Sequence, residues 1–290
     1  MTAPQLPAGA CDCHVHVVAP QADYPMLADR HYTPGPASAN ALRGHMQRLG
    51  LAHAVIVQPS IYGSDNRLLV DSLLALDGAA RGVAVADEDI CDADLTRLHD
   101  AGVRGVRVNL ESTGASDAAA VSRALSAWAG RLAGQGWHIQ VYASLDAIAS
   151  AIPALVRLPV PVVLDHFAMI PAQLALDDPR VRQVLDLVGS GAAYVKLSAS
   201  YRISADPDAG GEAERVTELA RAFIGRNPER ALWASDWPHT NREPGKLPTE
   251  VSAYRDVAPD RLARELESWL PDAALRRQVL AANPAALYGF

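Results

Sequence analysis

Residues 138–165, HIQVYASLDAIASAIPALVRLPVPVVLD, contain the unit that decides the fold. A short run rich in Val and Ile (His138–Ala143) precedes a segment with helical periodicity (Leu145–Leu155), and a second short run follows (Val162–Asp165). Most runs of this kind in the chain are continuous apolar stretches rather than alternating ones, which is typical of strands buried on both faces of a parallel sheet. The stretch therefore predicts a strand–helix–strand unit with parallel strands.

The same alternation continues in both directions along the chain. We expect a (β/α)8 TIM barrel rather than a doubly wound open sheet, because no GxGxxG follows any run. The expected strands are Cys11–Val18, Ala54–Gln58, Gly82–Ala86, Val103–Leu110, His138–Ala143, Val162–Asp165, Tyr194–Ser198 and Leu232–Ser235. The expected helices between them are Ala39–Leu49, Asp65–Leu76, Asp92–Ala101, Asp117–Leu132, Leu145–Leu155, Pro179–Val188 and Gly211–Gly225.

The chain shows no linker, low-complexity segment or internal repeat, so residues 1–290 are expected to form a single barrel domain. Two helices, Asp260–Leu280 and a shorter one over 283–288, are expected to close it. The net charge of −7 argues against nucleic acid or an anionic membrane as a partner, but a small anionic substrate stays open. The sequence alone leaves the oligomeric state undetermined.

The location of the protein is expected to be cytoplasmic. The N-terminus lacks the apolar core of a signal peptide, and the most apolar stretch, Val141–Leu164, carries two charges and three prolines. The three cysteines, Cys11, Cys13 and Cys91, have no metal-finger spacing and are expected to be reduced thiols.

Polar side chains follow three of the expected strands. His14 and His16 lie two apart on the first, His166 ends the sixth, and Asp236 ends the eighth. Each of these residues alone could have a purely structural role. A histidine could bond to the backbone, and a carboxylate could cap the next helix. Because the carboxyl ends of all barrel strands meet at one mouth, we expect the four to lie together as a catalytic or metal-binding group.

These stretches resemble the amidohydrolase superfamily (amidohydrolase-2 type), in the lactonase branch typified by 2-pyrone-4,6-dicarboxylate lactonase. The similarity runs from about Gly9 to Tyr288. The HxH pair is shared by the whole superfamily. The stretches QPSIYGSDN (58–66) and SDWPH (235–239) are much more specific. The matching segments are DCHVH (12–16), VQPSIYGSDN (57–66), RGVAVAD (81–87), GVRVN (105–109), Asp165-His166, SDWPH (235–239) and Asn283-Pro284.

The resemblance implies a role for each matching position. Asp236 would be the general base that takes a proton from water, and three histidines, His14, His16 and His166, would polarise the lactone carbonyl. Five side chains would grip a small-molecule lactone: Tyr32, Ser60, Arg107, Tyr142 and Arg202. For Arg107 a surface salt bridge is the structural alternative.

Two departures from the dicarboxylate-specific pattern concern arginines. Those relatives carry one where this chain has Met169 and another where it has Thr113. Half of the clamp for a second carboxylate is therefore missing. We expect a sugar lactone or a monocarboxylate lactone, such as a muconolactone, as the substrate.

No Lys or Glu ends the fourth or fifth strand, so a binuclear metal site is not expected. A single zinc ion could be held by His14, His16 and Asp236, with His166 as a further ligand. A lactone is an activated ester, so we expect no obligatory metal.

Three other functions stay open at this stage. A lactone isomerase would use a hydroxyl of the substrate in place of water, and a metal-dependent decarboxylase would use the same superfamily site. A barrel that only binds its ligand is the non-catalytic alternative. The Asp12-x-His14-x-His16 pattern favours hydrolysis over decarboxylation, because related decarboxylases usually show a Glu-x-His or Glu-x-x-x-His pattern on the first strand.

Overall fold

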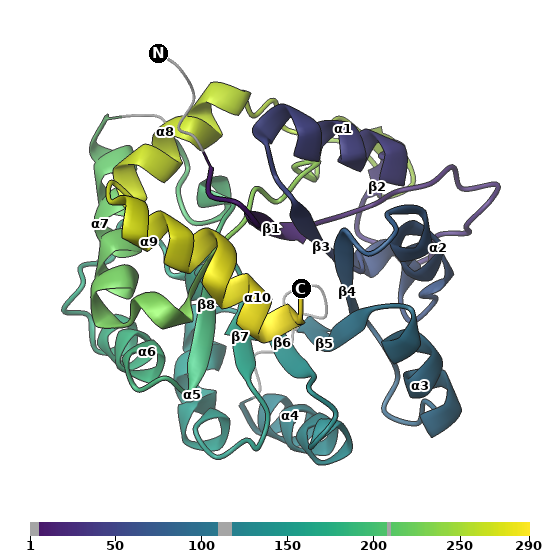
Figure 1. Ribbon diagram of the computed structural model, residues 1–290, viewed down its shortest axis with the longest axis horizontal. Coiled ribbons are helices and arrows are strands. Elements are labelled where there is room, and N and C mark those ends of the chain that lie inside the picture. Colours follow the sequence, from purple (N-terminus) through teal and green to yellow (C-terminus); the bar gives the residue numbers. More distant parts are fainter. Residues whose placement is uncertain (1–5, 110–117, 208–209) are drawn as a thin grey trace.

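Eight parallel strands form the centre of the molecule (Figure 1). The computed structural model describes residues 6–109, 118–207 and 210–290. The strands follow one another around the sheet in chain order. They are β1 (Cys11–Val15), β3 (His53–Val57), β4 (Ala80–Ala84), β5 (Val103–Asn109), β6 (His138–Tyr142), β7 (Val162–Leu164), β8 (Ala193–Leu197) and β9 (Ala231–Trp233).

The sheet closes where the chain leaves β9 and meets β1. Val15 pairs with Trp237 in a parallel bridge. The amide of His16 donates to the carbonyl of Trp237 over 2.8 Å, and the amide of Asp236 donates to the carbonyl of His14 over 3.0 Å. The predicted TIM barrel is confirmed, and all eight expected strands are present with ends shifted by up to three residues.

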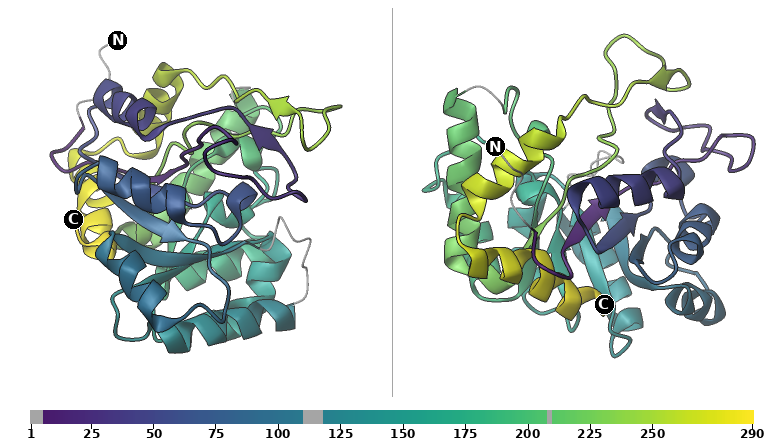
Figure 2. Two further views of the ribbon diagram at one scale, coloured as in Figure 1. Left: turned by 90° about the vertical axis from the view of Figure 1, so that its right-hand side faces the viewer. Right: turned by 45° about the horizontal axis from the view of Figure 1, so that its top comes forward.

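Helices surround the strands (Figures 1 and 2). Side-chain caps fix several of their starts: Ser38 and Ser144 each accept a hydrogen bond from the first turn, and Gly50 ends the first helix in the left-handed conformation. The helices are α1 (Ala39–Leu49), α2 (Arg67–Ala75), α3 (Asp92–Asp100), α4 (Ala118–Leu132), α5 (Leu145–Leu155), α6 (Pro179–Gly189), α7 (Gly210–Arg226), α8 (Pro259–Trp269), α9 (Ala273–Arg277) and α10 (Asn283–Tyr288).

The single helix expected over Asp260–Leu280 is wrong. The chain breaks at Leu270, because Pro271 follows it and the residue before a proline is pushed out of the helical conformation. Asp272 then starts α9 by accepting hydrogen bonds from the amides of Ala274 and Leu275. A π-helical turn (Gln278–Ala282) joins α9 to α10.

Two short strands that the sequence did not predict lie outside the barrel. β2 (Thr33–Pro34) and β10 (Val251–Ser252) pair in parallel. They belong to the long segments that follow β1 and β9, and Figure 2 shows these segments projecting beyond the ring of strands. Because both segments leave carboxyl ends of neighbouring barrel strands, they lie on the side of the mouth.

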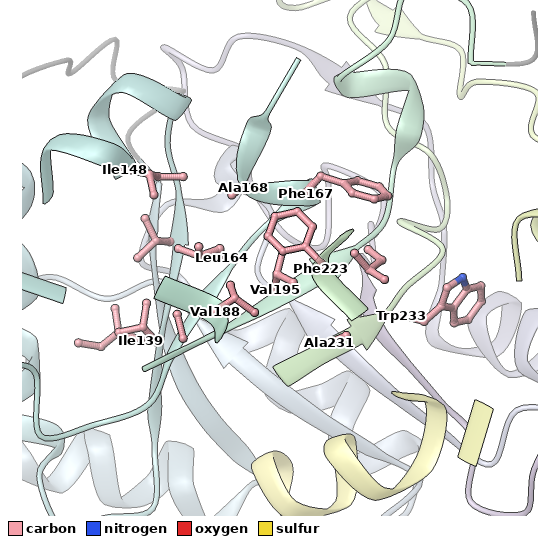
Figure 3. Packing of buried hydrophobic residues seen from close by; sticks show 14 of the residues in the cluster. Ile139, Ile148, Leu164, Phe167, Ala168, Val188, Val195, Phe223, Ala231 and Trp233 are labelled. Atoms are coloured by element: carbon pink, nitrogen blue, oxygen red, sulfur yellow. The ribbon is translucent and has the colours of Figure 1, made fainter. Parts of the chain in front are cut away.

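The core has two layers. Outside the barrel, apolar residues of the strands pack against the helices, as Figure 3 shows around Leu164, Phe223 and Trp233. Inside it, a second cluster joins residues of the strands to α10. Its members are Cys11, Cys13, Val55, Val57, Val83, Val163, Leu232, Ala234, Leu287 and Tyr288.

All three cysteines are free thiols, with Cys91 exposed. In the described part of the chain, no helix combines the length and the apolar character needed to cross a bilayer.

Candidate functional site

An irregularity in β1 turns the two histidines toward the barrel axis. Between β1 and β3 the register shifts: Asp12 pairs with Ala54, but Val15 pairs with Ile56. Three residues along β1 thus match two along β3. The extra residue in β1 interrupts the alternation of side chains between the two faces of the strand. Cys13 belongs to the interior cluster, and His14 directly after it lies with the polar groups of the mouth.

The other members enter through left-handed turns after β7 and β9. His166 (φ 46°) begins the 3-10 turn η2 (His166–Met169), in which every residue has positive φ. Asp236 (φ 62°) lies three residues beyond the end of β9. Left-handed backbone is costly for residues other than glycine, by about 1–2 kcal/mol each, and such strain clusters at functional sites.

The four groups converge on one point. The Oδ1 atom of Asp236 lies 3.6 Å from Nε2 of His16, 3.7 Å from Nε2 of His14 and 4.0 Å from Nε2 of His166. The Nε2 atoms of His14 and His16 are 3.3 Å apart. These distances show that the four side chains lie together, as the sequence led us to expect. All four are also buried.

Each histidine is held from behind through its Nδ1 atom. His16 lies 2.7 Å from the carbonyl oxygen of Val57, which can only accept, so Nδ1 carries the proton and Nε2 carries a lone pair. Nδ1 of His166 lies 2.8 Å from Oγ of Ser198. Burial lowers the pKa of His14 to about 3 and that of His16 to about 4, and it also lowers the pKa of His166. All three imidazoles are neutral at pH 7.

The two oxygens of Asp236 have different surroundings. Oδ2 accepts from the hydroxyl of Tyr201 (2.7 Å) and from Nε and Nη2 of Arg202 (3.1 and 2.8 Å). Oδ1 is buried and has no hydrogen-bond partner among the described residues. Burial opposes ionisation, but Arg202, followed by the histidines, holds the pKa of Asp236 well below its usual value.

A second buried carboxylate, Asp165, lies behind His14. Its Oδ2 accepts from Nε of Arg107 and from Nε2 of Gln140, each over 3.0 Å. Its Oδ1 lies 3.3 Å from Nδ1 of His14 and 3.6 Å from Nζ of Lys196. Burial opposes ionisation of Asp165 too, but His14, Arg107 and Lys196 keep its pKa well below its usual value.

Arg107 and Arg202 were expected to grip the substrate. In the structure each guanidinium pairs with a buried carboxylate of the protein. The salt bridge considered for Arg107 as the alternative is therefore present, but it is buried rather than on the surface, because the side chain is only 6% exposed. Both arginines lie at the mouth, but their charges are largely compensated.

The remaining expected substrate contacts lie around the same mouth. Tyr142 ends β6, where its ring meets that of His166 (centroids 5.4 Å apart) and the guanidinium of Arg107 (4.8 Å). Tyr32 shares a hydrogen bond with Thr240, which also accepts from Arg202. Ser60 begins the turn η1 (Ser60–Tyr62) after β3, and Met169 ends η2. Thr113 lies outside the described residues.

A metal could be held by part of this group. Among the described residues, His14, His166 and Asp236 offer ligand atoms within 4.8 Å of one another. Zinc ligands at about 2.0–2.1 Å from an ion stand about 3.4 Å apart in a tetrahedron. His16 is not a member of this group, although its Nε2 lies 3.3 Å from Nε2 of His14 and 3.6 Å from Oδ1 of Asp236.

Comparison with known proteins agrees with this arrangement. The family model of the amidohydrolases (Amidohydro_2) matches residues 11–290. The chain belongs to this amidohydrolase family. A 2-pyrone-4,6-dicarboxylate hydrolase of Comamonas testosteroni is 33% identical over 98% of this chain and 91% of its own length. A D-galactarolactone isomerase of Agrobacterium fabrum is 28% identical over 98% of this chain and 92% of its own length.

A solved structure from Pseudomonas putida has a similar fold, with a TM-score of 0.80 and 29% identity over 98% of each chain. The predicted family and the prediction of an enzyme are therefore confirmed.

Sequence reasoning missed several polar residues of this amidohydrolase site. Lys196 and Gln140 lie inside expected strands, and only their spacing marks them: polar side chains recur at every second position in His138-x-Gln140-x-Tyr142 and in Lys196-x-Ser198. That period places them on one face of each strand. Tyr201 and Asp165 adjoin residues that were singled out, but were given no role.

Asp12, which lies two residues before the HxH pair, does not face the site. Its oxygens accept from the amide and hydroxyl of Ser235 (2.9 and 2.5 Å), and Nε2 of His45 lies 3.4 Å away. Asp12 thus joins β1 to the segment that carries Asp236.

Proposed function

We propose that this protein hydrolyses a lactone, with Asp236 as the general base. The observation that carries the proposal is the Oδ1 atom of Asp236, which is buried, ionised and free of hydrogen bonds among the described residues, and which three imidazoles face. Oδ1 takes a proton from water while the hydroxide adds to the lactone carbonyl. When the ring C–O bond breaks, the proton passes to the departing alkoxide, and a hydroxy acid results.

The histidines have unequal roles in this scheme. Stabilising the developing oxyanion requires N–H donors, which a neutral imidazole supplies from one nitrogen only. The proton of His16 is on Nδ1, so its Nε2 serves as an acceptor or ligand. Polarisation of the carbonyl therefore falls to His14 and His166. Tyr201 and Arg202 hold Oδ2 of Asp236 and so keep Oδ1 turned toward the substrate.

A single zinc ion fits part of this group, since the imidazoles of His14 and His166 and a carboxylate oxygen of Asp236 offer ligand atoms within 4.8 Å of one another. His14, His166 and Asp236 would hold it, with His16 as the further ligand. A bound ion would polarise the carbonyl as a Lewis acid. We propose that the ion is not obligatory, because a lactone is activated enough for N–H donors to suffice.

The charges of the site limit the substrate. Three cations, Arg107, Arg202 and Lys196, face two carboxylates, Asp165 and Asp236, which leaves at most one positive charge to compensate a ligand. A buried carboxylate without a matching cation loses several kcal/mol of hydration that nothing restores. We propose a neutral or singly charged lactone, such as a sugar lactone or a monocarboxylate lactone, bound through the hydroxyls of Tyr32, Ser60 and Tyr142.

The test is a panel of sugar lactones, muconolactones and pyrone carboxylates, followed by acid release with and without chelator. We expect kcat/KM for neutral and singly charged lactones to exceed that for the pyrone dicarboxylate. Met169→Arg should narrow this gap, whereas the matched variant Met169→Leu should leave it unchanged. If the parent protein hydrolyses the dicarboxylate fastest, the proposed charge limit is wrong.

A lactone isomerase is the second candidate, favoured by the similarity to a galactarolactone isomerase. The same base would then remove a proton from a substrate hydroxyl, which would attack the carbonyl within the molecule. Isomerisation releases no acid, so the same assay separates the two reactions.

A further inference from the structure

Lys196 has no part in the proposed reaction, yet it lies beside the site. Of the 26 basic residues in the chain only two are lysines, Lys196 on β8 and Lys246 on an exposed loop. Lys196 is completely buried. Its ammonium donates to Oε1 of Gln140 over 2.6 Å. Desolvating a flexible ammonium is expensive, so its placement needs an explanation.

The explanation lies at Nδ1 of His14, which has two neighbours of opposite kind. Nζ of Lys196, a donor, lies 3.5 Å away, and Oδ1 of Asp165, an acceptor, lies 3.3 Å away. A neutral imidazole carries one proton, on either Nδ1 or Nε2. Both tautomers of His14 therefore find a partner behind the ring.

The surroundings of Nε2 of His14, the nitrogen that faces the site, favour one tautomer in the absence of a metal. Nε2 of His14 lies 3.3 Å from Nε2 of His16. The proton of His16 is held on Nδ1 by the carbonyl of Val57, so its Nε2 can only accept. A proton on Nε2 of His14 then satisfies both nitrogens: Nε2 donates to His16, and Nδ1 accepts from Lys196. Consistent with this tautomer, Oδ1 of Asp165 has no hydrogen-bond partner among the described residues.

We propose that Lys196 and Asp165 are positioning residues that decide which nitrogen of His14 carries the proton. When Lys196 donates to Nδ1, the proton is on Nε2 and His14 is an N–H donor toward the site. When Asp165 accepts from Nδ1, Nε2 carries a lone pair and is a ligand for a divalent ion. The number of protons on the ring stays at one: solvent removes the proton from Nε2 and returns one to Nδ1.

The pair would let one set of side chains serve with or without an ion. Outer hydrogen bonds commonly set the tautomer of metal-binding histidines through an acceptor alone. Here the donor Lys196 lies beside the acceptor Asp165, and Lys196 stabilises the tautomer of His14 expected without a metal. The proposal concerns the protein without substrate, so its failure leaves the proposed lactone hydrolysis standing.

The test is ¹⁵N NMR of chelator-treated protein labelled at histidine, in which protonated and unprotonated ring nitrogens have distinct shifts. His14→Gln assigns the signals. In the parent protein we expect the proton of His14 on Nε2. In Lys196→Met we expect it on Nδ1, because Asp165 alone remains behind the ring. Lys246→Met, at the only other lysine, is the control and should match the parent. A proton on Nδ1 in the parent, or an unchanged tautomer in Lys196→Met, would overturn the proposal.

Asp165→Asn tests the role of Asp165 in the tautomer that binds an ion. It also keeps the proposal testable if Lys196→Met does not fold. Addition of Zn²⁺ to the parent should move the proton to Nδ1. Asp165→Asn should bind Zn²⁺ 10- to 100-fold more weakly. Asp146→Asn removes an exposed carboxylate that pairs with Arg180, and its zinc affinity should equal that of the parent. Zinc that fails to bind, or that binds without moving the proton, would refute the role of Asp165.

Discussion

The two ends of the barrel interior contain very different groups. At the carboxyl ends of the strands, Asp165 and Asp236 are buried with Arg107, Arg202 and Lys196, and each charge has an opposite charge within 4 Å. At the amino ends, the interior holds thiols, valines and the ring of Tyr288. His138 lies there with no hydrogen-bond partner for either ring nitrogen among the described residues, and its ring meets that of Tyr288 edge-on.

The difference shows how one set of strands separates stability from chemistry. The amino end is packed by neutral groups around α10, and substitutions there should change the free energy of unfolding. The carboxyl end contains left-handed backbone and paired charges, which cost stability but keep a buried carboxylate ionised with one oxygen free of hydrogen bonds among the described residues. Substitutions there should change turnover.

Lowering the pH should produce the largest effect of all, a loss in the free energy of unfolding that arises at both ends of the barrel. Burial lowers the pKa of His138 to about 3, as it does for His14 (about 3) and His16 (about 4). Between those values and about 6.5, the unfolded chain binds protons that the folded chain does not. Stability is therefore lost as the pH falls through this window, by about 1.4 kcal/mol per pH unit for each histidine.

The measurement is the free energy of unfolding in urea at several pH values between 7 and 4.5, with chelator present. His138→Gln should reduce the slope by about 1.4 kcal/mol per pH unit, because one of the histidines that burial keeps neutral is gone. An unchanged slope in that variant would mean that the amino-end histidine is not held neutral.

Asp236→Asn should produce the next largest effect, confined to the carboxyl end. An amide still accepts hydrogen bonds from Tyr201 and Arg202, but it cannot take a proton from water. We expect kcat to fall by about 10²–10⁴-fold while KM changes little. Turnover of the best lactone of the panel measures this. Activity within threefold of the parent would remove Asp236 from its proposed role.

Gly105→Ala should produce a smaller effect, confined to the amino end. Gly105 pairs with His138 across β5 and β6, and a Cβ atom there would lie 2.4 Å from the imidazole ring. Overpacking of this kind costs about 1–3 kcal/mol. Gly130, exposed on α4, has open space around it, and Gly130→Ala should stabilise by about 1 kcal/mol.

Urea unfolding of both glycine variants supplies the comparison. Gly105→Ala combined with His138→Ala should recover part of the loss, because the second change removes the clashing ring. A Gly105→Ala variant as stable as the parent would show that the amino end is less tightly packed than its contacts indicate.

The sequence predicted the fold well because its signals are local. Apolar runs and helical segments alternate eight times, and each run became a strand. The break at Leu270 was missed because the apolar periodicity continues across Pro271. β2 and β10 were missed because two residues carry no periodic pattern. The expectations of one domain and a cytoplasmic location stay predictions.

The site was predicted only in part, for a physical reason. His14 lies near the end of β1, the other three, His16, His166 and Asp236, lie just beyond strands, and the barrel brings strand ends together. The pairing of Arg107 with Asp165 and of Arg202 with Asp236 depends on side-chain distances across the barrel, which no local pattern encodes. Spacing could have revealed Lys196, but not its position beside His14.

One measurement tests the central claim that water opens the ring. The best lactone of the panel is turned over in H₂¹⁸O, and the product is analysed by mass spectrometry. Hydrolysis with Asp236 as the base predicts one ¹⁸O atom in the new carboxyl group of each product molecule, and Asp236→Asn should abolish this incorporation above the uncatalysed background. A product with the mass of the substrate and no ¹⁸O would contradict the account and establish an isomerase.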